Sequence, residues 1–410
     1  MNVLLVGSGG REHALAWKLA QSPSLSELHA APGNPGIARL GTCHPVRPDD
    51  VEGVVELARD LHCDLVVVGP EAPLVAGLAD ALRRASIPVF GPSAAAARIE
   101  GSKHFAKDVM RAAGVPTAAA LAVARPPCVI KADGLAAGKG VFVCRTQDEL
   151  DAGLRAAASF GGQLVIEELL EGEEVSVFAL CDGERAVALA PAQDFKRALD
   201  GDEGPNTGGM GSYAPVAGFG LDEAAATVEA VHAPVLAELA RRGSPFTGLL
   251  YAGLMLTEDG PRVLEFNCRF GDPETQSLMP LLEGDLLAAL AAAAEGRLDR
   301  VDLRSTSGRA AVTVVLAATS YPESSDSGTT IEGIGEAEAA GALVFHAGTA
   351  LRDDRLVTNG GRILDVAGVG DSVASAREAA YAACGLIRST ALRYRNDIAL
   401  VATEKEAILG

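Results

Sequence analysis

The sequence predicts a multidomain α/β protein whose first domain is built on a parallel sheet. The chain has 410 residues, more than one ordinary hydrophobic core requires, so two to four domains are expected. Short apolar runs alternate with helical patterns over residues 1–100, which is typical of a parallel sheet covered by helices. Several apolar runs then follow one another closely between residues 127 and 182, and they predict a smaller β-rich unit.

The first domain is expected to span residues 1–100. The run NVLLVG predicts a buried strand, and a glycine turn leads from it into the helical pattern REHALAWKLAQS. The same succession returns as DLVVVGPEAPL, LADALRRA and IPVFGP. In an open parallel sheet the loops at the carboxyl ends of the strands carry the functional groups, so these loops are the first places to search.

A larger second domain is expected over residues 101–118 and 182–308, with the small β-rich unit inserted at 119–181. A helix in SKHFAKDVMRAAGVP leads into the inserted unit, whose expected strands are PCVIKA, GVFVCR, LVIEEL and EVSVFALCD. A polar, glycine-rich loop at 193–220 follows, and then a helix at 222–242 that we expect Pro234 to kink.

The strands LLYAGLMLT and RVLEFN are expected to lie side by side at the end of this second domain. The remaining residues, 309–410, predict a smaller α/β or α+β domain, and no internal repeat is visible.

Composition excludes several classes of function. The net charge of −19 and the absence of a basic run argue against nucleic-acid binding. The seven cysteines are scattered without a CxxC pair, which favours a reducing cytosol and therefore a cytoplasmic location. No apolar run approaches the roughly 18 residues of a membrane helix, so no membrane partner is expected.

The segment EFNCRFGDPETQ, residues 265–276, places polar side chains where an apolar strand ends. Side chains two positions apart share one face of a strand, so Glu265 and Asn267 are expected to project together, and Arg269 joins them if the strand continues. Carboxylate and amide oxygens beside a guanidinium suit a divalent cation with anionic oxygens next to it.

The segment VIKADGLAAGKGVFV, residues 129–143, predicts a phosphate-binding loop between two strands. Its glycines allow backbone N–H groups to approach phosphate oxygens, while Lys131 and Lys139 supply positive charge. The spacing is not that of a Walker loop, because only three residues separate Gly134 from Gly138 and Gly140 stands in the Ser/Thr place. A plain glycine-rich hairpin is the alternative.

The turn VGSGGREHA, residues 6–14, opens a helix directly after the first strand and is therefore a natural anion site. A dinucleotide fingerprint would require a third glycine where Glu12 stands, and the second strand, which ends in HAAPGN, lacks the ribose-binding acid. Two interpretations stay open: an unspecific Rossmann-like turn and a site for a substrate phosphate.

Two further segments carry polar groups of the expected kind. IEELLEGEEVS offers backbone groups to a purine edge between two strands and a carboxylate beyond them. DFKRALDGDEGPNTGGMGSY is a long polar loop, and such loops are more often functional than structural. The candidate residues in the two segments are Glu168, Leu170, Glu174, Asp194, Lys196, Arg197 and Asn206.

Taken in this order, the motifs closely resemble those of the phosphoribosylamine–glycine ligase (glycinamide ribonucleotide synthetase) family of the ATP-grasp superfamily. The resemblance covers nearly the whole chain and rests on GSGGREHALAWK, PGNPG, VGPEAPL, EGSKHFAKD, KADGLAAGKGV, GPNTGGMGSY, LYAGLM, EFNCRFGDPETQ, VFHAGT and VTNGGR. It implies a pre-ATP-grasp domain, an ATP-grasp core with a small lid, and a C-terminal domain.

The resemblance also implies an activity. ATP phosphorylates the carboxylate of glycine to glycyl phosphate, and the amine of 5-phosphoribosylamine attacks it to give glycinamide ribonucleotide, ADP and phosphate in de novo purine synthesis. The implied cofactors are ATP and Mg²⁺ or Mn²⁺, and the expected assembly is a monomer or a small homo-oligomer.

Roles for individual residues follow from the same resemblance. Glu265 and Asn267 would bind the metal, and Arg269 would stabilise the acyl phosphate or the glycine carboxylate. The expected nucleotide contacts are Lys103, Lys131, Gly138, Lys139 and Gly140 for the phosphates, Glu168 and Leu170 for adenine, and Glu174 for the ribose. The expected substrate contacts are Gly9, Gly10, Arg11 and Asn34 for the ribose phosphate, together with Asp194, Lys196, Arg197, Asn206 and Asp272. Lys131 and Arg269 are the expected catalytic residues.

The chain departs from the family pattern in three places. The segment AAALAVARPPC is too short for the helix that relatives carry before the VIKADG strand, so the lid is trimmed. Phe195 stands where relatives have His, and Ala399 stands where Gly is usual. Three rival functions stay open: another carboxylate–amine ligase, an NAD-dependent oxidoreductase, and a nucleotide-binding module without catalysis.

Overall fold

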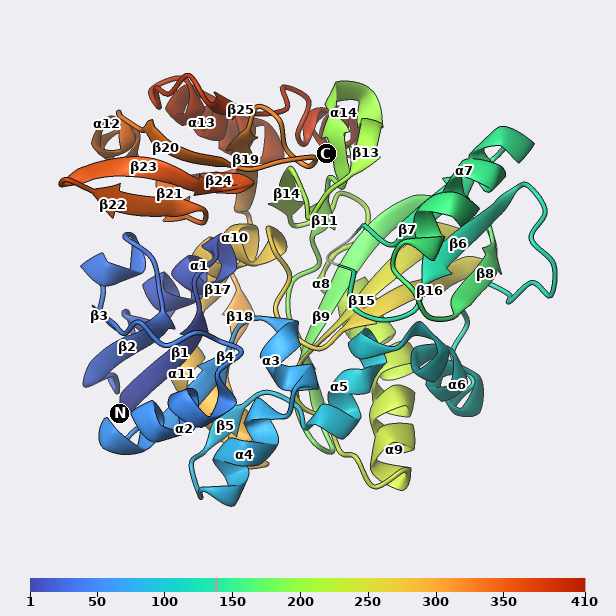
Figure 1. Cartoon of the computed structure of the whole chain (residues 1–410), viewed down its shortest axis with the longest axis horizontal. Helices are drawn as coiled ribbons and strands as arrows, with labels where there is room; N and C mark the ends of the chain where they lie inside the picture. Colours follow the sequence, from blue (N-terminus) through green and yellow to red (C-terminus); the bar gives the residue numbers. More distant parts are fainter. Residues whose placement is uncertain (137–138, 410) are drawn as a thin grey trace.

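The computed structural model describes residues 1–136 and 139–409. Figure 1 shows the first domain in blue at the lower left, the C-terminal part in orange and red above it, and the small inserted unit on the right. Gly138, expected in the phosphate-binding loop, lies outside the described residues. No helix within the described part of the chain is long and apolar enough to cross a membrane.

The N-terminal sheet is parallel, as the sequence predicts. Its strand order is β3-β2-β1-β4-β5, and each neighbouring pair runs in the same direction. Consecutive residues of β1 and β4 are buried on both faces of the sheet, which explains why both runs are continuously hydrophobic. The elements are β1 (Asn2–Gly7), α1 (Gly10–Leu19), β2 (Glu27–Pro32), β3 (Thr42–Cys43), α2 (Val51–Asp60), β4 (Leu65–Val68), α3 (Glu71–Val75), α4 (Leu78–Arg84), β5 (Val89–Phe90) and α5 (Ala94–Gly101).

The second domain is built on the antiparallel sheet β10-β9-β15-β16. The strand β9 (Glu173–Asp182) was expected to be the fourth strand of the inserted unit, and this expectation is wrong. It pairs with β15 (Thr247–Thr257) from Leu256↔Glu173 to Thr247↔Asp182, so it belongs to the larger sheet. The other elements are α6 (Lys103–Ala113), β10 (Ala186–Ala188), α8 (Leu221–Thr227), α9 (Ala233–Arg241), β16 (Gly260–Asn267), α10 (Glu274–Leu278), β17 (Leu282–Glu283), α11 (Leu286–Ala294) and β18 (Arg304–Ser305).

The helix expected at 222–242 is interrupted just before Pro234. A π-helical turn at Val228–His232 separates α8 from α9, and Pro234 lies in the first turn of α9. Proline lacks an N–H donor and is tolerated only near the start of a helix, so the wider turn accommodates it.

The lid is a three-stranded antiparallel sheet in the order β7-β6-β8, with one helix. The helix α7 (Gln147–Ala158) was not expected, although Thr146 and Glu149 form a capping box at its start. Among the described residues between α6 and β6 there is no helix, in agreement with the trimmed segment, and Leu121 and Ala124 pack against the small lid core. The strands are β6 (Cys128–Ala132), β7 (Val141–Cys144) and β8 (Leu164–Glu168).

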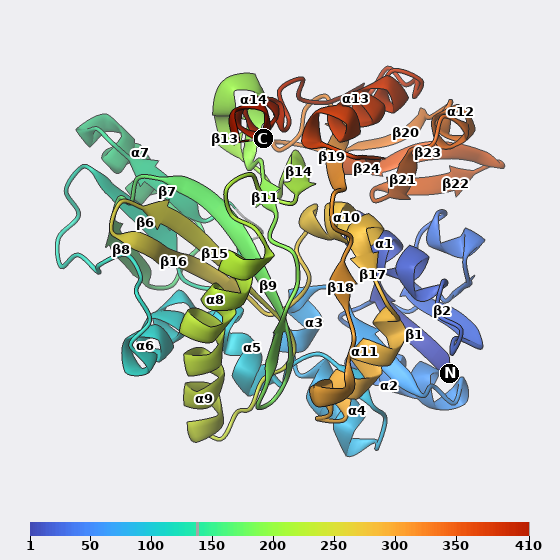
Figure 2. The same cartoon turned by 180° about the vertical axis from the view of Figure 1, so that it is seen from behind.

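The C-terminal part contains a sheet in the order β11-β14-β19-β24-β21, with β25 beside β19. Two of its strands come from the polar loop of the second domain, because β14 pairs with β19 from Gly211↔Val314 to Ala214↔Ala311. Figure 2 shows this loop running up to the C-terminal part from behind. The strands of the loop are β11 (Gln193–Asp194), β12 (Arg197–Leu199), β13 (Glu203–Asn206) and β14 (Gly211–Ala214). The C-terminal elements are β19 (Ala310–Ala318), β20 (Asp326–Thr330), α12 (Ile334–Ala339), β21 (Leu343–His346), β22 (Thr349–Arg352), β23 (Arg355–Gly360), β24 (Arg362–Gly370), α13 (Val373–Cys384), β25 (Leu392–Arg393) and α14 (Leu400–Leu409).

Candidate active site

The polar end of β16 is arranged as its alternation predicts. Glu265 and Asn267 lie on one side of the strand, and Phe266 on the other side is buried in the core. A bulge opposite Gly253 and Leu254 shifts the register at Leu264, which is only partly buried for this reason. The bulge and strand end together bring the carboxylate and the amide to the surface of the sheet.

Several cations surround the Glu265 carboxylate. The Lys196 Nζ lies 3.9 Å from Glu265 Oε1, and Lys103 and Lys131 are close enough to act on it electrostatically. Burial alone would raise the pKa of Glu265, but these lysines and Arg269 outweigh burial and lower it. Glu265 is therefore an anion held among positive groups, although its side chain remains 38% exposed.

Lys131 is fixed from two sides. Its Nζ donates to the carbonyl of Leu264 at 2.8 Å and lies 2.8 Å from Glu167 Oε2. The other oxygen of Glu167 lies 2.8 Å from Lys107 Nζ, so one buried carboxylate holds two lysines. Glu167 was not predicted as a site residue, although the pairing of β6 with β8 puts Glu167 and Lys131 on one face of the lid sheet and Glu168 on the other.

Glu168 and Glu174, expected at the nucleotide, carry local partners. The Glu168 carboxylate accepts from the Ala119 N–H at 2.8 Å and lies 3.0 Å from Arg262 Nη1. The Glu174 carboxylate lies 2.7 Å from Lys196 Nζ. The roles of these residues and of Leu170 toward adenine and ribose stay predictions.

Arg269 joins the site, held by carboxylates from the first domain. Its Nε donates to Glu71 Oε2 at 3.2 Å, and its Nη2 lies 3.3 Å from Glu100 Oε1. Burial would lower the pKa of Arg269, but Glu100, Glu71 and Glu274 raise it, so the guanidinium stays charged. Glu71 and Glu100 lie in VGPEAPL and EGSKHFAKD, two motifs that supported the family resemblance but from which no site carboxylate was predicted.

The loop expected to bind phosphate lies between Lys103 and the C-terminal part. Lys103 Nζ donates to the carbonyl of Gly134 at 2.9 Å, and Lys139 Nζ donates to the carbonyl of Pro322 at 3.1 Å. Asp133 accepts from the backbone N–H of Lys103 at 2.6 Å and thereby caps α6. The loop is thus tied to α6 at one end and reaches the C-terminal part at the other, with Gly140 following at the start of β7.

The polar loop after β11 brings some of its expected residues to this site. Burial raises the pKa of Asp194 to about 7, although neighbouring Lys196 opposes the shift. Asn206 Nδ2 donates to the carbonyl of Val141 at the lid, 3.2 Å away. The Arg197 side chain instead donates through Nη1 to the carbonyl of Gly204, 2.7 Å away in the same loop.

Phe195, where the family resemblance led us to expect His, packs against the core. Its ring lies 6.3 Å from that of Tyr213 and 5.3 Å from the Arg395 guanidinium. Phe195 lies between β11 and β12 and packs against the core, while the Lys196 side chain next to it reaches Glu174 and Glu265.

The residues at the strand end fit a hard divalent cation. Glu265 offers a carboxylate, and Asn267 uses its Nδ2 on Glu100 Oε1 at 3.1 Å, which leaves Oδ1 for a metal. The described residues contain no group of three or more His, Cys, Asp or Glu side chains arranged for a metal. Two oxygen ligands beside several lysines therefore fit Mg²⁺ or Mn²⁺, which share their coordination with nucleotide phosphates and water.

A polar cavity opens between the first domain and the C-terminal part. Its volume is about 430 Å³. It lies at the carboxyl ends of β1 and β2, the place where open parallel sheets bind ligands. Its lining residues are Ser8, Gly9, Pro32, Gly33, Asn34, Asp272, Ala347, Gly348, Thr349, Asn359 and Arg362.

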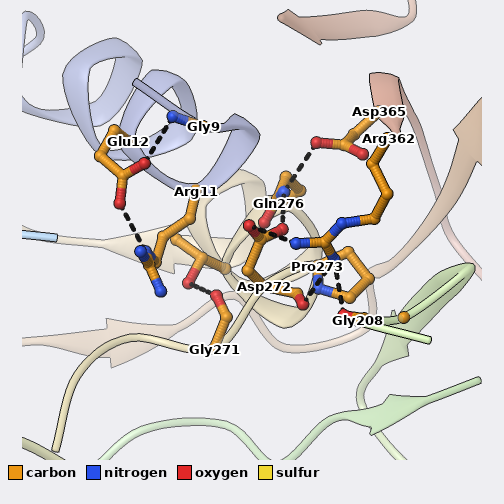
Figure 3. Close-up of polar contacts among 12 residues, drawn as sticks. Gly9, Arg11, Glu12, Gly208, Gly271, Asp272, Pro273, Gln276, Arg362 and Asp365 are labelled. Atoms are coloured by element: carbon orange, nitrogen blue, oxygen red, sulfur yellow. Dashed lines mark hydrogen bonds and ion pairs between the residues drawn. The ribbon is translucent and has the colours of Figure 1, made fainter. Parts of the chain in front are cut away.

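Asp272 and Arg362 form the charged wall of this cavity (Figure 3). The Arg362 Nη2 lies 2.8 Å from Asp272 Oδ2, and its Nη1 donates to the carbonyls of Gly208 and Asp272 at 2.6 and 2.9 Å. Asp272 was predicted as a substrate contact, whereas Asn359 and Arg362 were not, although both lie in the quoted motif VTNGGR.

The four residues expected at the ribose phosphate are separated by the structure. Gly9 and Asn34 line the cavity. The Asn34 side chain is fully engaged, because it donates to the carbonyls of Ser8 and His346 and accepts from two backbone N–H groups. Gly10 and Arg11 do not line it: Gly10 faces Asp365, and Arg11 donates to the carbonyl of Phe270 at 3.2 Å.

The N-terminus of α1 already binds a carboxylate of the protein itself, that of Glu12. The Glu12 carboxylate accepts from the Gly9 N–H at 2.6 Å and lies 2.6 Å from Arg11 Nε (Figure 3). It fills the place where a dinucleotide pyrophosphate would approach the helix, which argues against the NAD-dependent oxidoreductase.

Comparison with known proteins covers the same three parts of the chain. Family models described as "Phosphoribosylglycinamide synthetase" match as the N domain over residues 1–100, the ATP-grasp (A) domain over 101–275 and the C domain over 311–401. A phosphoribosylamine–glycine ligase of Brucella melitensis is 49% identical over 99% of both chains, and one of Streptomyces coelicolor is 50% identical over 97% of this chain and 99% of the relative.

Solved structures agree with this result. A crystal structure of phosphoribosylamine–glycine ligase from Thermotoga maritima superposes with a TM-score of 0.81 at 34% identity, covering 97% of this chain and all of the other. The biotin carboxylase domain of Hydrogenobacter thermophilus 2-oxoglutarate carboxylase superposes with a TM-score of 0.69 at 17% identity, over 96% and 91% of the two chains, and therefore shares the fold alone.

Proposed function

The chain belongs to the phosphoribosylglycinamide synthetase family, and from this premise we propose how its residues divide the work of the reaction. The protein is an ATP-dependent carbon–nitrogen ligase of purine biosynthesis that joins glycine to 5-phosphoribosylamine. The products are glycinamide ribonucleotide, ADP and phosphate, with glycyl phosphate as the intermediate.

The convergence of Glu265, Asn267 and Arg269 with three lysines is the observation that carries the residue assignment. A carboxylate is a poor electrophile, and its phosphorylation supplies a leaving group. Transfer of a phosphoryl group between two anions is mainly a matter of positioning and charge neutralisation. Lys103, Lys131 and Arg269 supply positive charge at one place, where the γ-phosphate and the glycine carboxylate would meet.

Glu265 and Asn267 would hold a divalent cation, Mg²⁺ or Mn²⁺. Such an ion would neutralise charge on the phosphates of the nucleotide. The protein's own groups orient the rest: Glu167 fixes Lys131 at 2.8 Å, and Glu71 with Glu100 fixes Arg269.

The 430 Å³ cavity would hold 5-phosphoribosylamine, with Asp272 and Arg362 at its wall. Its polar lining and its position at the strand ends suit a sugar phosphate. The amine attacks in its neutral form; as the carbon–nitrogen bond forms, the bond to phosphate breaks and the nitrogen releases one proton. The seven free cysteines fit a cytoplasmic location, and whether the chain is a monomer or a small homo-oligomer stays a prediction.

One assay tests the reaction. ADP release is measured with glycine and freshly generated 5-phosphoribosylamine, and each substrate is omitted in turn. Release should require both. Release that is indifferent to glycine would overturn the assignment in favour of another carboxylate–amine ligase.

A substitution tests the metal assignment. Glu265→Ala should lower kcat by at least about 100-fold because the carboxylate would hold the cation, while the protein stays folded because Lys196 keeps its closer partner Glu174 at 2.7 Å. Circular dichroism and thermal unfolding monitor the fold. Unchanged turnover of the variant at saturating Mg²⁺ would contradict the assignment.

A further inference from the structure

One carboxylate, Glu100 in the last turn of α5, binds three consecutive residues at the end of β16. It accepts from Asn267 Nδ2 at 3.1 Å through Oε1 and from the Cys268 N–H at 2.7 Å through Oε2. The Arg269 Nη2 lies 3.3 Å from Oε1. The side chain of Glu100 is only 8% exposed, so these contacts are shielded from water.

The contact with Asn267 determines which end of that amide is free. Burial and Glu71 raise the pKa of Glu100, whereas the Arg269 guanidinium and the Cys268 N–H oppose this shift and favour the ionised form. An ionised carboxylate accepts hydrogen bonds and donates none, so it binds the NH₂ end of the amide and excludes the oxygen. Within the described parts of the chain no donor reaches Asn267 Oδ1. The amide oxygen is thereby kept for a ligand on the Glu265 side of the strand.

The backbone contact makes this arrangement rigid. The Cys268 N–H cannot rotate away, because Cys268 is buried at the strand end, and it holds Oε2 of Glu100 in place. Oε1 is then left for Asn267 and Arg269 together. The amide and the guanidinium therefore share one acceptor and are positioned by the same group.

We propose that Glu100 is a positioning residue that sets the orientation of the Asn267 amide, so that its oxygen and not its nitrogen faces the metal. This inference rests on the proposed metal role of Glu265 and Asn267. Outer carboxylates that orient metal ligands are a general device of metal sites, and their loss weakens metal binding by about 10- to 100-fold.

The substitution Glu100→Gln tests the proposal with almost no change of shape. The glutamine has one acceptor and one donor, and the fixed Cys268 N–H takes the acceptor. The new NH₂ group then faces Asn267, whose amide rotates to offer its oxygen inward and its nitrogen toward the metal. We expect the affinity for Mn²⁺ in the presence of ADP, followed by the electron paramagnetic resonance of free Mn²⁺, to fall about 10-fold or more. Affinity equal to that of the wild type would overturn the proposal.

A compensating substitution separates orientation from mere packing. In Glu100→Gln/Asn267→Asp, the new aspartate accepts from the glutamine NH₂ with one oxygen and offers the other oxygen to the metal. The double variant should recover most of the lost Mn²⁺ affinity, and it also serves as the test if Glu100→Gln fails to fold. A double variant as weak as Glu100→Gln would contradict the orientation role.

Glu71→Gln is the matched control, because Glu71 contacts Arg269 but not Asn267. It should leave the Mn²⁺ affinity unchanged, and a loss equal to that of Glu100→Gln would assign the effect to Arg269 instead. Glu265→Gln distinguishes a failure of the proposed metal site from a failure of the positioning role of Glu100. If it binds Mn²⁺ as the wild type does, the metal site itself is misplaced. If it loses Mn²⁺ while a folded Glu100→Gln keeps it, only the positioning role fails.

Discussion

The chain contains two glycine-rich turns that look alike in sequence and differ in structure. The first, Gly7–Gly10, is closed by the protein's own carboxylates. A Cβ on Gly9 would lie 2.9 Å from Glu12 Oε2, and one on Gly10 would lie 1.7 Å from Asp365 Oδ2. The second turn has room at Gly134, where a Cβ would meet nothing within 4 Å among the described residues, although one on Gly140 would lie 2.6 Å from the Ala136 Cβ.

The difference shows what a run of glycines does and does not predict. In both turns glycine permits a backbone that other residues avoid, with φ values of +131° at Gly7 and +98° at Gly134. Only the surroundings decide whether the space is used by the protein or left for a ligand. An anion site at the first turn is therefore already satisfied by Glu12, while the second turn keeps room at Gly134 beside Lys103.

The largest contrast is expected from the same substitution in each turn. Gly10→Ala should lower the free energy of unfolding by about 2–3 kcal/mol, because the new methyl group overlaps a buried carboxylate. Gly134→Ala has room for the methyl group and should cost only about 1 kcal/mol, from the positive φ. Urea unfolding of both variants measures the difference. Equal losses would show that the two turns are constrained alike.

A second contrast concerns the pH dependence of stability, which we expect from Asp365, the carboxyl group next to Gly10. Burial and the neighbouring Asp272 raise the pKa of Asp365 to about 7 in the folded protein, from an ordinary value of 3.8. Between these values the unfolded chain has lost a proton that the folded protein retains, so the free energy of unfolding falls as the pH rises.

Asp365→Asn removes this dependence. Relative to the wild type, the variant should gain roughly 2 kcal/mol of stability between pH 5 and pH 8. Denaturant unfolding of both proteins at the two pH values checks it. A difference between variant and wild type that is the same at pH 5 and pH 8 would show that Asp365 is ionised throughout.

The smallest effect is expected in the open turn. Lys139 is exposed and reaches the carbonyl of Pro322, so Lys139→Ala should leave the unfolding midpoint unchanged. Its charge lies beside the expected phosphates, and the KM for ATP should rise about two- to fivefold, the size of a solvated ion-pair contribution. Initial-rate measurements at varied ATP decide this, and an unchanged KM would remove Lys139 from the nucleotide site.

Local sequence patterns predicted the features that depend on a single short segment. The parallel sheet of the first domain followed from the alternation of apolar strands and helices, and the shared face of Glu265 and Asn267 followed from strand periodicity. The helix α7 was missed although its capping box is visible in the sequence at Thr146 and Glu149.

Contacts between segments that lie far apart in the sequence could not be predicted from local patterns. The run that forms β9 carries no mark of which sheet it joins, because a buried strand looks the same in either. Glu71, Glu100 and Glu167 are acids in otherwise ordinary helices and strands, and only the folded chain shows that each holds a cation of the site. Arg362 meets Asp272 across 90 residues, which no local spacing predicts.

The C-terminal sheet includes two strands, β11 and β14, that come from the polar loop in the middle of the chain. A fragment starting near residue 309 would therefore be released with the edge of β19 uncovered, where unpaired backbone groups invite association with other chains. A cut before β11 is no remedy, because β9 and β10 before it and β15 after it belong to one sheet, so the two halves of this enzyme cannot be produced separately with both sheets complete.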